Sequence, residues 1–339
     1  MALERLHVRA PEFPLVQWLN CGDPPTLAGC RGNVVLIDVW DFTSTCCLAT
    51  LPTLRDWHER YAEAGLAILG VHTPQFAFAR DVPAVRRAVG RLGVCWPVAL
   101  DNDQAIRALL TNLVRPTVDL VDRAGYVRFR LEGECGYVEL EEALRSLLQE
   151  PPGPAAPLPE RSAVREASSD ATCRRRPPEF QAESVGNGPL PEDKTITLAM
   201  PASRPQGAFY LAGEWRLAQR GLTLVGGPGE VMLPFEASSV HVVAANGDKP
   251  PLETPEPAWV EVELDGRPVP DGCYGADLLS RQGATWLPIV SARDYALALS
   301  LPAGSHELRL RAVSPGTTFY AFSFPASFDS LPAERSDPC

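Results

Sequence analysis

Residues 33–52 read NVVLIDVWDFTSTCCLATLP, and this stretch decides the fold of the first part of the chain. It opens with a short, continuously apolar run rich in β-branched side chains, which predicts a buried strand. Ser44 is a good helix N-cap type. Between residues 47 and 64 apolar side chains recur at three- and four-residue steps, as in a helix with one buried face. The strand therefore leads into a helix whose first turn carries two neighbouring cysteines, Cys46 and Cys47.

The alternation of strands and helices continues to about residue 150. Strands are predicted at 66–71, 94–100, 117–121 and 126–131, and helices at 82–92, 104–111 and 138–149. The turn DRAG at residues 122–125 joins the last two strands as a hairpin. We therefore expect residues 1–150 to form an α/β domain with a central mixed sheet and helices on both faces.

The amino-acid composition of the chain changes after residue 150. Residues 151–194 are rich in proline, glycine and charge, and we interpret them as a linker, with a docked segment as the alternative. Between residues 195 and 327 short apolar or alternating stretches recur between turns, which predicts an all-β sandwich of jelly-roll type. Residues 328–339 remain as a C-terminal tail. Two domains are also the expectation for a chain of 339 residues.

Composition narrows the possible partners. The net charge is −11 and no stripe of lysine and arginine offsets it, so nucleic acid and anionic membranes are poor candidates. No run approaches the roughly 18 apolar residues of a membrane span, and the first residues lack a signal-peptide core. The nine cysteines are scattered and odd in number, which fits mostly free thiols in a reducing compartment, and we predict a cytoplasmic location. No Cys or His spacing is that of a zinc site, and we expect neither a metal nor another cofactor.

Several segments together resemble a known family. QWLN, NVVLIDVW, GVHTPQF, PVALDND and RPTVDLVDRAGYVRFRLEGE follow one another through residues 10–150 and are similar to redoxin/thioredoxin-like domains of the DipZ and TlpA type. FYLAGEW and SHELRLRAVSPGTTFYAFSF resemble the β-sandwich that follows this domain in DipZ-type proteins and has the shape of a carbohydrate-binding module. The resemblance implies a thioredoxin-like fold and thiol–disulfide chemistry on a protein partner.

The cysteine motif departs from that family. Two cysteines separated by two residues begin the helix in the family, whereas here Ser44 stands at the first, attacking position and Cys47 at the second. Cys46 is an additional thiol between them. A serine hydroxyl does not stay deprotonated near neutral pH and cannot form a mixed disulfide, so this sequence does not support the usual two-cysteine cycle.

We predict that Cys47 is the reactive thiol, because the first turn of a helix stabilises a thiolate. Cys46 or an external thiol would then resolve its oxidised form. Ser44 caps the helix, with a hydrogen bond to the thiolate or substrate as a second role. The S-x-x-C pattern also resembles the core of peroxiredoxins, in which the later cysteine attacks a peroxide. The alternative is that Cys47 is an inert buried cysteine.

Four further residues complete the predicted site. Asp38 lies nine residues before Cys47, where thioredoxin-like proteins bury an acid that relays protons, and by the same resemblance Pro116 is a cis-proline beside the cysteines. Trp40 and Arg115 would help Pro116 to position the substrate. An ordinary polar strand end for Asp38 and a solvated surface position for Arg115 are the alternatives.

Other candidate residues carry weaker signals. Tyr210, Trp215 and Trp286 of the sandwich could stack on a sugar or contact a partner, although core packing is the larger expectation. His58 and His72 are predicted to be structural, because neither has a recognisable acidic or cysteine partner.

Two functions therefore stay open. The first is a thiol-dependent oxidoreductase, acting on disulfides or as a peroxiredoxin-like antioxidant on peroxides. The second is a catalytically degenerate thioredoxin fold that acts as an adaptor, with the sandwich binding carbohydrate or a protein.

Overall fold

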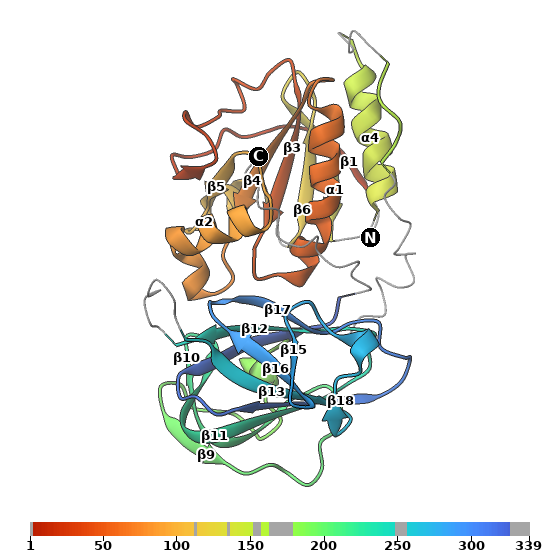
Figure 1. Ribbon diagram of the computed structural model, residues 1–339. Helices are drawn as coiled ribbons and strands as arrows, with labels where there is room; N and C mark the ends of the chain where they lie inside the picture. The colour runs from red at the N-terminus through yellow and green to blue at the C-terminus, as the bar shows by residue number, and fades with distance from the viewer. Residues whose placement is uncertain are drawn as a thin grey trace. The chain divides into compact units, whose positions relative to one another are not determined.

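The computed structural model describes residues 3–111, 114–133, 136–151, 157–162, 179–247 and 256–325. The chain divides into two compact units, the first holding the described residues up to 162 and the second those from 179 onward. Each unit is built on its own β-sheet (Figure 1).

In the part of the first unit that the structure describes, seven strands form a mixed sheet with the order β1-β7-β6-β3-β4-β5-β2. Its strands are β1 (Glu4–Arg9), β2 (Trp18–Leu19), β3 (Val34–Trp40), β4 (Leu66–His72), β5 (Val98–Leu100), β6 (Thr117–Val121) and β7 (Tyr126–Glu132). Strand β3 pairs parallel with β4 and antiparallel with β6. All seven residues of β3 are buried, as its unbroken apolar run predicts.

The helices of this unit are α1 (Thr45–Tyr61), α2 (Val82–Arg91), α3 (Ala105–Leu109) and α4 (Tyr137–Gln149), with a 3-10 turn η1 (Ala77–Arg80). Val35, Ile37 and Val39 of β3 pack with Ile106 of α3 on one face of the sheet. The alternate residues of β3 point to the other face, where α4 packs on the strand. This confirms the predicted mixed sheet with helices on both faces.

Over the described residues 179–247 and 256–325, the second unit is one large antiparallel sheet of twelve strands. They are β8 (Phe180–Gln181), β9 (Thr195–Leu198), β10 (Tyr210–Ala218), β11 (Gly221–Phe235), β12 (Val240–Asn246), β13 (Ala258–Leu264), β14 (Arg267–Pro268), β15 (Leu279–Arg281), β16 (Ala284–Ile289), β17 (Arg293–Ala298), β18 (His306–Ala312) and β19 (Thr317–Ser323), with short turns η2 (Ala182–Ser184) and η3 (Asp271–Cys273). The long β11 pairs with β10 and β18 and, at its start, with β19, so the sheet curls over on itself. This architecture is that of the predicted β-sandwich.

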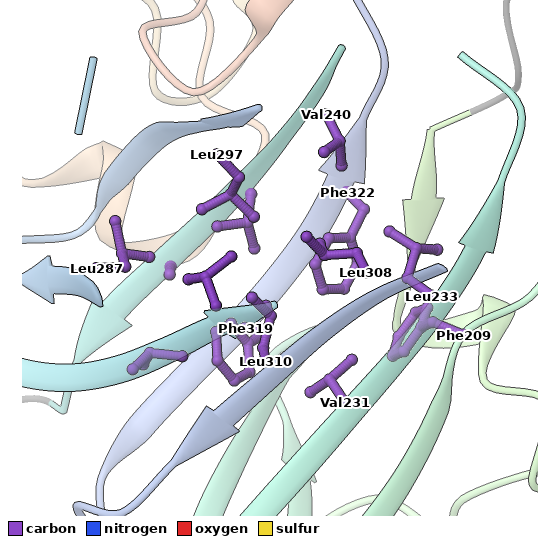
Figure 2. Packing of buried hydrophobic residues seen from close by; sticks show 14 of the residues in the cluster. Phe209, Val231, Leu233, Val240, Leu287, Leu297, Leu308, Leu310, Phe319 and Phe322 are labelled. Atoms are coloured by element: carbon purple, nitrogen blue, oxygen red, sulfur yellow. The ribbon is translucent and has the colours of Figure 1, made fainter. Parts of the chain in front are cut away.

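The interior of the curled sheet is filled with apolar side chains from distant strands. Figure 2 shows Leu233 of β11, Leu308 of β18 and Phe322 of β19 among them. The rings of Phe209 and Phe322 meet edge to face, with centroids 5.2 Å apart. A continuous core of this kind explains why the second unit is compact by itself.

Two of the predicted sugar-contact residues belong to this core. Tyr210 is 3% exposed and its hydroxyl donates to Pro205 O, while Trp215 is 1% exposed and its Nε1 donates to Ala212 O. Both rings therefore pack in the core, which was the larger expectation for them, and neither ring face is open to a sugar. Trp286 is half-buried.

Described parts of the segment predicted as a linker are docked. In the first unit Arg145 donates to Pro159 O at 2.7 Å and Glu141 Oε1 accepts from Ser162 N at 2.8 Å. In the second unit β8 pairs antiparallel with β19, and Asp193 N donates to Leu217 O. Residues 179–194 therefore belong to the sheet of the second unit rather than to a linker.

Candidate functional site

The loop between β3 and α1 brings most of the predicted site residues together. Ser44 occupies the N-cap position of α1 with extended backbone angles, but its side chain makes no capping hydrogen bond. Its hydroxyl instead hydrogen-bonds the Cys47 sulfur, one helical turn further on. The serine at the position of the family's first cysteine thus interacts with the remaining one.

Cys47 lies on the inner side of the first turn of α1 and has no exposed surface. Burial raises the pKa of the Cys47 thiol well above its usual range, and the charges of Asp38 and Asp41 raise it further. Hydrogen bonds from the Ser44 side chain and the Asp41 backbone offset only part of this effect on the pKa. In this structure the burial of the sulfur therefore outweighs the favourable helix start, and Cys47 is held as a thiol.

Cys46 is half-buried and is not disulfide-bonded to Cys47. Cys21, Cys30 and Cys273 are also thiols, whereas Cys95 is disulfide-bonded. Cys135, Cys173 and Cys339 lie outside the described residues. Among the cysteines that the structure describes, the expectation of mostly reduced thiols is met except at Cys95.

Asp38 projects from the middle of β3 into the interior, on the side of α1 and α4. It is completely buried, and neither carboxylate oxygen has a hydrogen-bond partner among the described residues. Burial raises the pKa of Asp38 from its ordinary 3.8 to about 7. Its charge raises the pKa of Cys47, so the two groups interact across the interior. A carboxyl with this pKa can both accept and release a proton near neutral pH.

Tyr137, which sequence reasoning did not single out, lies beside these two groups. It begins α4, and its ring packs against Trp57 of α1 with centroids 6.0 Å apart. Burial raises its pKa, and the charge of Asp38 raises the pKa further. Since residue 137 is merely the first of an amphipathic helix, only the packing of α4 on β3 reveals this proximity.

A second carboxylate, Asp41, stands at the carboxyl end of β3. Its Oδ1 accepts hydrogen bonds from the backbone N and the hydroxyl of Thr43, both at 2.9 Å, and its Oδ2 accepts from Gln75 N at 2.6 Å. His72 Nε2 lies 3.6 Å from Asp41 Oδ1. Burial acts to raise the pKa of Asp41, but its interactions with His72 and Thr43 and the charge of Arg115 lower it.

His72 therefore has an acidic neighbour, Asp41, which the sequence analysis did not predict. The strand pairing could have indicated this neighbour, because β3 and β4 are parallel and Trp40 is in register with His72. The residue that follows Trp40 is thus expected near the end of β4. His58 contacts Trp96 edge to face at 5.8 Å, in line with the structural role predicted for it.

The predicted substrate-positioning residues occupy different environments. The Arg115–Pro116 peptide is cis, as predicted. Arg115 is half-buried and donates to Gln75 Oε1 at 3.2 Å. Trp40 is fully buried against His72, so it cannot touch a partner that remains outside the unit.

Comparisons with known proteins found one matching family model and several similar proteins. The model of the family described as "Thioredoxin like C-terminal domain" matches residues 179–324. The DipZ proteins of Mycobacterium bovis and Mycobacterium tuberculosis are 30% identical over 241 residues, which cover 69% of this chain and 34% of each relative. The thiol-disulfide oxidoreductase YkuV of Bacillus subtilis is 23% identical over 141 residues, 39% of this chain and 88% of its own. The crystal structure of a thiol-disulfide isomerase from Corynebacterium glutamicum covers 42% of this chain and 97% of its own, at 24% identity and a TM-score of 0.38.

The sheet order, the cis-proline and the cysteines at the start of α1 define the first unit as a thioredoxin-like domain. The match of the second unit and the similarity to DipZ over 69% of this chain support a thioredoxin-like redoxin of the DipZ type. It spans about a third of the length of the DipZ relatives that it matches. None of the helices in the described ranges combines the length and apolarity that crossing a bilayer requires.

Proposed function

We propose that the first unit is a thiol-redox domain in which Cys47 reacts and Asp38 accepts its proton. The observation that carries this proposal is the burial of Asp38 without a hydrogen-bond partner in the described part of the chain. An unpaired carboxylate in an apolar interior costs free energy, and no contact within the described fold offsets that cost. A proton acceptor beside a buried thiol gives the carboxylate a chemical reason to be there.

The proposed reaction begins with transfer of the Cys47 proton to the Asp38 carboxylate. The thiolate then attacks one sulfur of a partner disulfide, and the partner's S–S bond breaks as the new bond forms. The partner's other sulfur leaves as a thiolate and takes up a proton. Cys47 ends in a mixed disulfide, which Cys46 or an external thiol opens in a second exchange.

The environment of Cys47 assigns roles to its neighbours in this scheme. The Ser44 hydroxyl would stabilise the thiolate through the hydrogen bond that it already makes. Because Cys47 has no exposed surface, the first turn of α1 must open before a partner sulfur can reach it. Arg115 and the backbone at Pro116 would hold the partner chain. The names of the relatives YkuV and ResA, both thiol-disulfide oxidoreductases, support a disulfide as the substrate.

Trapping the mixed disulfide tests the proposal. The reduced full chain is incubated with glutathione disulfide, and mass spectrometry identifies the modified cysteine. We expect an adduct on Cys47 that disappears in Cys47→Ser and forms at least about tenfold more slowly in Asp38→Asn. Cys273→Ser, which removes a thiol of the second unit, is the matched control and leaves the rate at Cys47 unchanged. An adduct confined to other cysteines would refute the proposal.

A peroxide is the second oxidant class to be tested, because S-x-x-C resembles the peroxiredoxin core. In that reaction the thiolate attacks one peroxide oxygen and the O–O bond breaks, so that Cys47 becomes a sulfenic acid and the other oxygen leaves as hydroxide, which takes up a proton to form water. Dimedone labels sulfenic acids, so labelling of Cys47 after hydrogen peroxide would extend the proposal to antioxidant chemistry. Without labelling, disulfides remain the only substrate class.

The competing adaptor function is favoured by one observation, the complete burial of Cys47 with its raised pKa. On this reading the thioredoxin-like unit only binds, and the curled sheet of the second unit docks a protein partner. Absence of both the glutathione adduct and the dimedone adduct on Cys47, together with retained folding, would favour the adaptor.

A further inference from the structure

Asp41 and His72 are two buried titratable residues that the proposed reaction does not use. Both have no exposed surface, and Nε2 of the imidazole lies 3.6 Å from Oδ1 of the carboxylate. His72 is enclosed by the edge of Trp40 and by the stacked ring of Phe42, with centroids 5.6 and 5.4 Å away. Neither ring nitrogen of His72 has a hydrogen-bond partner within the residues the structure describes. A polar pair enclosed in this way is poorly explained by stability alone.

The contacts of Asp41 reach two loops around the reactive turn. Through Thr43 the carboxylate holds the loop that carries Ser44 and leads into α1. Through the 2.6 Å bond from Gln75 N it holds the loop that follows β4. The Gln75 side chain in turn accepts from Arg115, which precedes the cis-proline. One carboxylate thus links the cysteine-bearing loop to the elements that would face a partner.

Asp41 also acts directly on the reactive sulfur. Its backbone hydrogen-bonds the Cys47 sulfur, and its side-chain charge disfavours the thiolate. The other charged groups around Asp41 are Arg115, whose charge acts on it, and Asp38, which acts on the same sulfur from β3. Asp101, at the end of β5, contributes a backbone hydrogen bond to His72 O. Of these groups, Asp41 alone both fixes the turn and opposes ionisation of Cys47.

We propose that Asp41 is a positioning residue for the Cys47 site, which ties the cysteine-bearing loop to the loop after β4 and presents a negative charge to the sulfur. The inference uses the proposed function only in taking Cys47 as the reacting thiol. Removing the charge while keeping the shape separates the electrostatic role from packing. Asp41→Asn does this, because the amide oxygen can still accept from Thr43 while the amide nitrogen cannot accept from Gln75.

The experiment follows ionisation rather than turnover, so its result is independent of whether the redox reaction occurs. The full chain carries ¹³C at cysteine Cβ, and the Cys47 signal is the one lost in Cys47→Ser. Spectra from about pH 7 to about pH 11 follow the onset of Cys47 ionisation. In Asp41→Asn we expect this onset at a lower pH than in the parent chain, because one of the charges that raise the pKa of Cys47 has been removed. The Gln75 amide should exchange with solvent at least about tenfold faster.

Asp122→Asn is the matched control. Asp122 is a buried carboxylate of the same unit, and its Oδ1 accepts backbone hydrogen bonds in the β6–β7 turn. This variant changes the charge of the unit equally and should leave the Cys47 signal unmoved. If the Cys47 signal responds to pH identically in Asp41→Asn and in the parent chain, or Asp122→Asn moves it as far, or the Gln75 amide exchanges no faster, the proposal is overturned. Should the Asn variant fail to fold, Asp41→Ser carries the same expectation.

Discussion

Asp38→Asn is expected to stabilise the first unit, and the gain should depend on pH. Burial raises the pKa of Asp38 from 3.8 to about 7, and each pH unit of this gap corresponds to about 1.4 kcal/mol. Because the folded-state pKa is the higher one, the native protein retains a proton that the unfolded chain releases between about pH 4 and pH 7. The stability of the parent chain therefore falls across this window, by a total of about 4 kcal/mol. Asparagine resembles the protonated carboxyl in shape and carries no charge, so the variant escapes this loss.

Hydrogen exchange of the β3 and β4 amides provides the assay, since it reports the first unit separately from the second. Parent and variant are compared at the same pH, so that the intrinsic exchange rate cancels. We expect their free energies of unfolding to be similar near pH 4 and to differ by about 4 kcal/mol near pH 8, with the variant more stable. Asp122→Asn should show no comparable pH-dependent gain. A difference that stays constant with pH, or a variant that is less stable near pH 8, would refute the reasoning.

Three further substitutions test separate features. Ser44→Cys places a second thiol at the position whose hydroxyl now hydrogen-bonds Cys47. The rate of insulin disulfide reduction should rise at least about tenfold above a weak parent rate, because two thiols can complete the exchange. An unchanged rate would contradict the idea that the serine hydroxyl blocks two-cysteine cycling. Gly70→Ala places a Cβ 3.2 Å from the indole nitrogens of the buried Trp40 and Trp96. The free energy of thermal unfolding should fall by about 1–3 kcal/mol because of this crowding. An unchanged unfolding midpoint would show that the site has room for a methyl group. Arg130→Ala removes the guanidinium that lies 2.7 Å from the carboxylate of Asp119, a residue that is 1% exposed. The free energy of unfolding, measured with denaturant, should fall by about 3–5 kcal/mol because a buried charge is left unpaired. A fall of less than about 1 kcal/mol would show that this ion pair contributes little to stability.

Local sequence patterns predicted the elements with strong periodicity. The apolar run became β3, the helix after Ser44 begins at Thr45, and the DRAG turn joins β6 to β7. By contrast, β1 was missed because ERLHVR is charged and largely exposed, so its pairing with β7 leaves no hydrophobic pattern. Residues 222–225 and 230–234 are two apolar stretches separated by GGPG, yet they form one strand, β11, because pairing with β10 continues past GGPG through register shifts.

The sequence predicted which residues make up the candidate site, but not the pKa values of its ionisable groups. Motif spacing placed Asp38, Ser44 and Cys47 together, and the structure bears out that proximity. The helix start favoured a thiolate at Cys47, but burial is a property of the packed layers, which no local spacing encodes. Asp41 escaped notice for a related reason, since its partners Thr43, His72 and Gln75 meet only when β3 and β4 align in register.

The most direct test of the account is the rate at which Cys47 forms its mixed disulfide with glutathione as a function of pH, compared between the parent chain and Asp38→Asn. If Asp38 accepts the proton, the parent rate should rise with a midpoint near 7, the value to which burial brings its pKa, and this rise should vanish in the variant. Identical pH profiles for the two chains, or no adduct on Cys47 at any pH, would contradict the account.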